Sequence, residues 1–332
     1  MHRGTAGMTA FILRRLLQSL IVLLAMIIIV FFGVHVVGDP IWLLVSPDLT
    51  QDQIAEVARQ LGLDRPIWEQ FVVFLGNALH GDLGISFVHG QPAMKLILER
   101  LPATMELALF ALFLALVIGL PLGLYAGLRP ERAGSRAIMA ASILGFSLPT
   151  FWVGLMLIMV FAVILGWLPS TGRGPAMAFL GMETSLLSLK GLSHALLPAI
   201  NLALLKVSLV IRLTRAGVRE VLPLDFIKFA RAKGLSETRI VLVHVLRNIL
   251  IPVITVIGLE FGSLVAFSVV TESIFAWPGM GKLLLDSIQR VDRPVIVAYV
   301  MLIVVLFVVI NLIVDLLYCL LDPRIRLRDQ AS

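Results

Sequence analysis

The sequence contains few of the residues on which a soluble globular protein or a metal enzyme depends. Charged residues make up only 14% of its 332 positions. Its one cysteine, Cys319, cannot form an internal disulfide or a cysteine-based metal cluster. None of its six histidines stands at the HxxxH spacing of a metal site. We therefore expect neither a soluble domain nor a bound metal.

No segment supplies the phosphate-binding loop of a nucleotide enzyme. The stretch around Gly281 and Lys282 comes closest, but Leu283 stands where such a loop needs Ser or Thr, and the first glycine is missing. The net charge of +6 does not indicate nucleic acid, because the basic residues form no stripe with interleaved aromatics. We expect this chain to bind no ATP, no other cofactor and no nucleic acid.

Apolar residues are what the chain has in excess. They make up 59% of the sequence, and the mean hydropathy of +1.00 indicates a polytopic membrane protein. The run 16–37 would span about 33 Å as a helix, enough to cross a bilayer core of roughly 30 Å. It is longer than the apolar core of a signal peptide, so we expect a retained first transmembrane helix. Five further spans are expected near residues 104–128, 137–165, 194–211, 249–270 and 294–320.

The distribution of lysine and arginine predicts how these spans are oriented. With the amino terminus inside, the expected cytoplasmic segments hold 17 of these residues and the external segments hold 9. This positive-inside bias places both termini, residues 1–15 and 321–332, in the cytoplasm. Residues 38–100 then form an external region, and spans two to six follow within residues 101–320. The expected fold class is all-α polytopic, with six transmembrane helices and both termini cytoplasmic.

The external region 38–100 is expected to contain two amphipathic helices. Thr50 and Gln53 form a capping box at the start of the first helix, and Pro66 opens the second. The pattern leaves two roles open for this region. It is either a lip that meets a delivery protein or a cap that packs on the spans.

A polar, basic island between the fourth and fifth spans, residues 222–252, organises the chain. It predicts a short helix, a glycine break and a second helix. One face of the short helix groups Phe226, Phe229 and Ala230, with Ile227 beside them, and basic residues lie opposite. Such a helix fits the groove of a partner protein, because it has nothing of its own to bury against. A loop lying on the lipid headgroups is the alternative.

Capping residues support these two helices. Pro223 suits the start of the short helix, and Asp225 suits its first turn. Gly234 suits the left-handed cap at its end, and Ser236 suits the cap of the helix that follows. The island therefore has defined ends.

Five separated motifs, in this order, resemble one transporter family. GDP stands at 38–40, ARAKGLS at 230–236, HVLRNILIP at 244–252, TESIFAWPGMGKLL at 271–284 and DPRIR at 322–326. Together they resemble the permease subunits of dipeptide, oligopeptide and nickel ABC importers, in the DppB/OppB-like branch. The general importer motif begins Glu-Ala-Ala and is only partly met here, whereas the peptide-transporter form fits.

The resemblance implies a type I ABC importer permease fold and a path for dipeptides or oligopeptides that opens by alternating access. The implied partners are a second homologous permease subunit, two ABC ATPase subunits, an external solute-binding protein and the lipid of a bacterial inner membrane. ATP and Mg would be used by the ATPase subunits and not by this chain. The implied ATPase-coupling residues are Asp225, Phe226, Phe229, Ala230, Arg231, Ala232, Lys233 and Gly234.

Polar residues at two other places are candidates for the path itself. The predicted residues of an external gate are Glu272, Trp277, Pro278 and Gly279, and those of the translocation path are Glu260, Lys206 and Asn311. A carboxylate as deep as Glu260, where the family more often has a neutral amide, needs a polar partner or a water-filled path. Lys206 is the candidate partner. The alternatives are that Lys206 extends toward the cytoplasm and that Glu260 is protonated.

Other classes of function remain as alternatives. A permease of the same class could carry nickel or another small solute. An ion-coupled secondary transporter would show internal repeats or a relay of intramembrane carboxylates, and only Glu260 and Asp315 lie deep. A membrane enzyme would need a catalytic constellation, and no histidines or acids pair up to suggest one.

Overall fold

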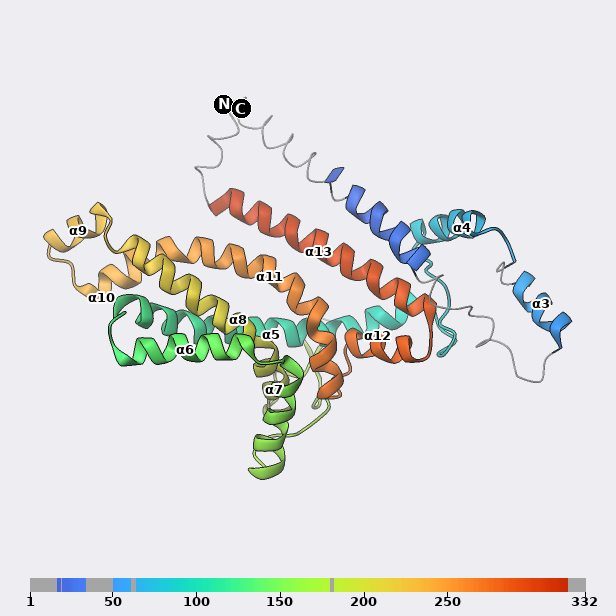
Figure 1. Ribbon diagram of the computed structural model, residues 1–332, viewed down its shortest axis with the longest axis horizontal. Coiled ribbons are helices and arrows are strands. Elements are labelled where there is room, and N and C mark those ends of the chain that lie inside the picture. Colours follow the sequence, from blue (N-terminus) through green and yellow to red (C-terminus); the bar gives the residue numbers. More distant parts are fainter. Residues whose placement is uncertain (1–16, 19, 34–49, 61–63, 180–181, 322–332) are drawn as a thin grey trace. The chain divides into compact units, whose positions relative to one another are not determined.

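The computed structural model describes residues 17–18, 20–33, 50–60, 64–179 and 182–321 (Figure 1). The predicted cytoplasmic segment 1–15 and the motifs at 38–40 and 322–326 lie outside these residues. The described part falls into two compact units. The first comprises Thr104–Trp277 and the chain from Val309, and the second comprises the residues up to Ala103 and Pro278–Val308.

Helices dominate both units. The regular elements are α3 (Gln51–Gln60), α4 (Ile67–Leu79), α5 (Ala93–Leu128), α6 (Ala133–Ser147), α7 (Thr150–Leu157), η1 (Ile158–Ile164), β1 (Met177–Phe179), β2 (Met182–Thr184), α8 (Leu189–Val221), α9 (Asp225–Ala232), α10 (Glu237–Arg239), η2 (Ile240–Val245), α11 (Leu246–Ile274), α12 (Met280–Gln289) and α13 (Arg293–Leu321). An apolar helix at Leu20–Gly33 precedes them.

Among the residues that the structure describes, four helical segments are long and apolar enough to cross a membrane, and a bent pair makes a fifth candidate. The four are Ala93–Leu128, Leu189–Val221, Glu237–Ile274 and Arg293–Val314. All four begin before their predicted spans, the last by a single residue, because polar turns at the ends continue the helix beyond the apolar run. The described part of the predicted first span, Leu20–Gly33, is shorter than a full crossing.

The predicted third span, 137–165, is not one straight helix. It consists of α6 and the segment Thr150–Ile164, which meet at an angle of 106°. Leu148 has extended backbone angles and Pro149 follows it. A residue before proline is pushed out of the helical region, and proline has no N–H to continue the hydrogen-bond ladder. In Figure 1, α7 turns away from α6 at this point.

The helical fold contains a small β element that was not predicted. Residues between η1 and α8 form an antiparallel hairpin, in which Ala178 pairs with Glu183. Gly172 before the hairpin has φ +83°, a left-handed conformation that interrupts a helix. The hairpin is therefore a small β element within a helical protein.

In the second unit, the predicted amphipathic helices are present. The Gln53 side chain accepts a hydrogen bond of 3.0 Å from the Thr50 backbone N–H, which confirms the capping box at α3. Pro66 is the N-cap of α4, as its position before the apolar stripe predicts. On α4, Phe71 and Phe74 lie with their ring centroids 5.2 Å from the ring of Phe31. This aromatic cluster packs α4 against the helix at Leu20–Gly33.

In the first unit, α5 and α8 approach each other at three glycines. A Cβ added at Gly119, Gly123 or Gly127 would lie 2.6 Å from a side-chain carbon of α8. The opposing residues are Val210, Thr214 and Val218. Glycine at every fourth position puts all three on one stripe of α5, which lets two helix backbones come close within a membrane. This glycine spacing is visible in the sequence, although the expected spans were drawn from hydropathy alone.

We predict that Gly123→Leu destabilises the first unit by about 1–3 kcal/mol or more, because the new side chain overlaps Thr214 in a filled contact. The midpoint of thermal unfolding of the purified chain in detergent measures this effect. Gly76→Leu is the matched control, since a Cβ there meets nothing within 4 Å. Equal midpoints for the two variants would contradict the importance of the contact.

Candidate functional site

The polar island forms the predicted helix, break and helix. Helix α8 ends at Val221, α9 occupies Asp225–Ala232, and a continuous helical segment runs from Glu237 to Ile274. The N-cap of α9 is Leu224, so Pro223 precedes the cap and does not occupy the first helical position. Asp225 stands in the first turn as predicted, where a carboxylate favours the helix dipole.

The apolar residues of α9 divide between two directions. Ile227 and Ala230, three positions apart, are buried against the flanking helices. Their buried partners are Val218, Val221, Ile240, Val245 and Ile249. Burying an isoleucine side chain contributes about 1.5–3 kcal/mol, so this contact holds α9 on its own chain.

The face predicted for a partner is therefore only partly correct. Ala230 belongs to the buried side, whereas Phe226 and Phe229 are 41% and 61% exposed. A helical wheel could not separate the two sets, because Ile227 and Ala230 border the same apolar arc as the two phenylalanines. The surface that α9 leaves open carries two aromatic rings.

The C-terminal end of α9 has the predicted left-handed cap. Gly234 has φ +76°, its N–H donates to the Arg231 carbonyl, and the Leu235 N–H donates to the Ala230 carbonyl. These two bonds form a Schellman motif, which glycine at this position allows without strain. Ser236 then caps α10 by accepting from the Arg239 N–H, as predicted. The turn of the loop is thus defined by backbone geometry.

Charged groups surround the exposed rings. Lys228 donates to Asp225 at 2.9 Å, Arg231 donates to Glu237 at 2.7 Å, and the Lys233 ammonium lies 4.6 Å from the centre of the Phe229 ring. The hydrogen bond that Arg231 donates to the Glu237 carboxylate raises the pKa of the Arg231 guanidinium. Exposed pairs of this kind contribute little stability. These pairs instead fix which charged groups lie beside the exposed rings of Phe226 and Phe229.

The pairing predicted for Lys206 and Glu260 is confirmed. The Lys206 ammonium on α8 donates to the Glu260 carboxylate on α11 and, at 2.8 Å, to the Ser263 hydroxyl. Lys206 is therefore not extended toward the cytoplasm. The two side chains are 15% and 36% exposed, so the pair is partly shielded. Asn311 is partly buried on α13, and its place in the path stays a prediction.

The predicted gate residues Glu272 and Trp277 are buried within the first unit. The hydroxyl groups of Thr104 and Ser268 donate to the Glu272 carboxylate at 2.7 and 2.9 Å. The Trp277 N–H closes the end of α11 by donating to the Glu272 carbonyl. In the second unit, Gly279 is the N-cap of α12, after Pro278. Their role as a gate stays a prediction.

A second buried carboxylate, Glu106 on α5, was missed by the sequence analysis. It accepts from the Arg173 guanidinium and from the Ser185 N–H, the latter at 3.0 Å. Arg173 also donates to the Glu183 carbonyl at 2.7 Å, which ties the hairpin to α5. The sequence could have indicated Glu106 as a paired residue, because a carboxylate just inside the start of an apolar span needs a polar partner. Among the described residues, no cluster of histidine, cysteine or acidic residues could hold a metal.

The chain is similar to known transport proteins in sequence and in fold. Residues 119–327 match the family model of the binding-protein-dependent transport system inner membrane component, and residues 8–108 match the model of its N-terminal region. The dipeptide transport system permease protein DppB of Escherichia coli K12 is 36% identical over 96% of this chain and 99% of that protein.

Two further similarities extend this result. The oligopeptide transport system permease protein AppB of Bacillus subtilis is 41% identical over 96% of this chain and 99% of that protein. A solved structure of the MetNI methionine ABC transporter, in an inward-facing conformation, matches with a TM-score of 0.50 and 19% identity. That match covers 69% of this chain and 97% of the other, and at this identity it concerns the fold.

We predict that Glu260→Gln and Lys206→Met each lower the thermal midpoint of the chain, because each leaves a partly shielded charge without its partner. The double variant should recover much of the loss. Their coupling should be about 0.5–3 kcal/mol, toward the lower end because Glu260 is 36% exposed. Additive losses in this double-mutant cycle would show that the pair contributes nothing as a pair.

Proposed function

Because this chain belongs to the family of binding-protein-dependent transport system inner membrane components, we propose that it is the permease subunit of an ATP-driven importer of dipeptides or oligopeptides. It is a multi-pass protein of the inner membrane. The substrate class is supported by the relatives whose names specify dipeptide, di/tripeptide and oligopeptide transport. The proposed partners are a second permease subunit, two ATPase subunits and an external solute-binding protein.

The observation that carries the proposal is the exposed aromatic surface of α9. A groove on an ATPase subunit would bury Phe226 and Phe229, while Ile227 and Ala230 keep the helix attached to the membrane part. A helix that packs both on the membrane part and in an ATPase groove can transmit movement from either one to the other. The nucleotide and Mg would belong to the ATPase subunits.

The transport step proposed for this chain is alternating access. Changing an equilibrium from 1:99 to 99:1 needs about 5.5 kcal/mol of differential free energy, which has to pass through the few contacts of α9. The packed cluster beneath α9 and the Schellman turn at Gly234 support that transfer, because they keep the helix from moving alone. Lys206 and Glu260, on two different spans, would face the path between the permease subunits.

The proposed arrangement has six spans with both termini in the cytoplasm. The excess of lysine and arginine on one side of the predicted spans supports it. The region 38–100, with α3 and α4, would lie outside, and α9 would lie inside. The boundaries proposed at 1–15, 16–37, 101–320 and 321–332 follow from the same orientation.

We predict that replacing Phe226 and Phe229 together by alanine weakens association with the ATPase subunits by about 2 kcal/mol, because buried aromatics are strong contributors to interfaces. Co-purification of the complex and substrate-stimulated ATP hydrolysis both measure this. Phe267→Ala is the matched control, since Phe267 is an exposed phenylalanine on α11 away from this loop. If both variants assemble and hydrolyse ATP alike, α9 is not the coupling element.

We predict opposite labelling of two single cysteines placed in a Cys319→Ser background. Gln60→Cys, in the region expected outside, should react with a membrane-impermeant maleimide added to intact cells. Lys228→Cys, whose position is well exposed on α9, should react only after the membrane is opened. Labelling of position 60 solely from the cytoplasm would overturn the orientation.

A further inference from the structure

A short loop in the second unit, residues 84–92, is held by one buried acid. The Asp292 carboxylate accepts from the Ser86 hydroxyl at 2.5 Å and from the Phe87 N–H at 3.1 Å. The Val88 N–H completes the set at 3.4 Å, and Asp292 itself is buried. The loop beside α12 is therefore held rigidly, although its Val88 and His89 side chains remain exposed.

The turn before Asp292 is strained. Val291 has φ +54°, which is a rare conformation for a β-branched residue. It stands where the Schellman motif that ends α12 usually has glycine, since the Val291 and Asp292 N–H groups donate to the Ile288 and Ser287 carbonyls. Such strain is concentrated at functional sites. Here the strained residue Val291 lies between Arg290, which precedes the turn, and Asp292, which lies beneath the loop.

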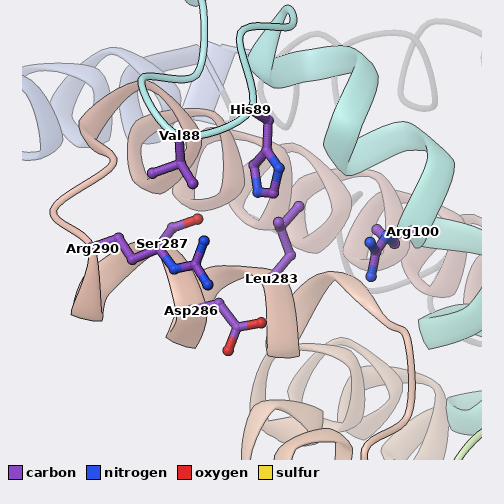
Figure 2. A pocket seen from close by; sticks show the side chains of 7 residues that line it. All are labelled: Val88, His89, Arg100, Leu283, Asp286, Ser287 and Arg290. Atoms are coloured by element: carbon purple, nitrogen blue, oxygen red, sulfur yellow. The ribbon is translucent and has the colours of Figure 1, made fainter. Parts of the chain in front are cut away.

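The loop, α5 and α12 enclose a pocket of about 70 Å³ (Figure 2). Seven residues line it: Val88, His89, Arg100, Leu283, Asp286, Ser287 and Arg290. Figure 2 shows the His89 ring extending from the loop toward α12, where the Arg290 guanidinium lies. Leu283 and Val88 supply the apolar walls. All of these residues belong to the second unit.

The charges around the pocket do not balance. Its one carboxylate, Asp286, already accepts from Lys282 at 2.9 Å. Among the residues that the structure describes, neither the Arg100 nor the Arg290 guanidinium has a hydrogen-bonding or ionic partner. Both guanidinium groups line the pocket and would attract an anion bound in it. The Ser287 hydroxyl and the His89 ring add further hydrogen-bonding groups.

We propose that this pocket binds a single carboxylate group, supplied by the free carboxyl terminus of a peptide. A guanidinium fits a carboxylate through two parallel hydrogen bonds, and about 70 Å³ holds that group but not a whole peptide. The walls of Val88 and Leu283 suit the carbon side of a carboxylate, whereas phosphate presents oxygen in every direction. The choice of a peptide as the source rests on the proposed function; the anion site does not.

Protection of arginine from phenylglyoxal tests the proposal on the purified full-length chain without ATP. Acetate and glycylglycine should slow modification of Arg290 and Arg100, measured by peptide mass spectrometry, and should leave Arg59 on α3 unchanged. Glycylglycine amide, which has no terminal carboxylate, should not protect. Because no transport is measured, a failure here is distinct from a failure of the proposed function.

Two variants show whether the pocket itself is responsible. Arg290→Gln should weaken protection of Arg100 by at least about tenfold, since it removes a charge-assisted hydrogen bond. Val88→Trp should abolish protection by filling the pocket with every charge retained. Arg59→Gln is the control, because it removes the same charge from an exposed site.

Three results would overturn the proposal. The first is equal protection of Arg59 and Arg290, or no protection by any carboxylate. The second is protection by inorganic phosphate where acetate and glycylglycine fail, which would indicate a phosphate site. The third is protection by acetate and not by glycylglycine, which would exclude the peptide as the source.

Discussion

The close contact of α5 with α8 is the constraint on which the first unit depends. In a bilayer there is no hydrophobic drive between helices, so association relies on how nearly two backbones can approach. The three glycines of α5 permit that approach along two turns of α8. Helix α8 leads through a three-residue turn to α9, so the place of the proposed coupling helix is set by the packing of the spans before it.

Three carboxylates in or next to the described spans are matched by donors from other elements. Glu260 meets Lys206 across α8 and α11, Glu106 meets Arg173 from the segment before β1, and Glu272 meets Thr104 from α5. An unpaired buried charge costs several kcal/mol, and less where it is partly exposed as Glu260 is, so a different packing of these helices would be disfavoured. The pairs therefore select one arrangement, even where their net contribution to stability is small.

The two proposed sites share one structural feature, a residue with left-handed backbone angles directly after a helix. At Gly234 and at Val291, a left-handed residue reverses the chain after a helix and places the next segment against a packed base. Glycine does this without strain, whereas valine at the same position has to be held by its surroundings. The first turn presents aromatic rings to a partner, and the second presents arginine to a pocket.

The sequence by itself determined the class of protein, most spans and the caps at Thr50, Gly234 and Ser236, because these depend on local pattern. It also named Lys206 as a candidate partner of Glu260, but only the structure showed that the two side chains pair. The tertiary structure decided which side of α9 is open, since Ile227 and Phe229 are equally apolar and only the surrounding helices distinguish them. It also decided the 106° bend at Pro149 and the gathering of Arg100 and Arg290 in one pocket. Residues nearly two hundred positions apart come to line one pocket only through packing, which local periodicity does not encode.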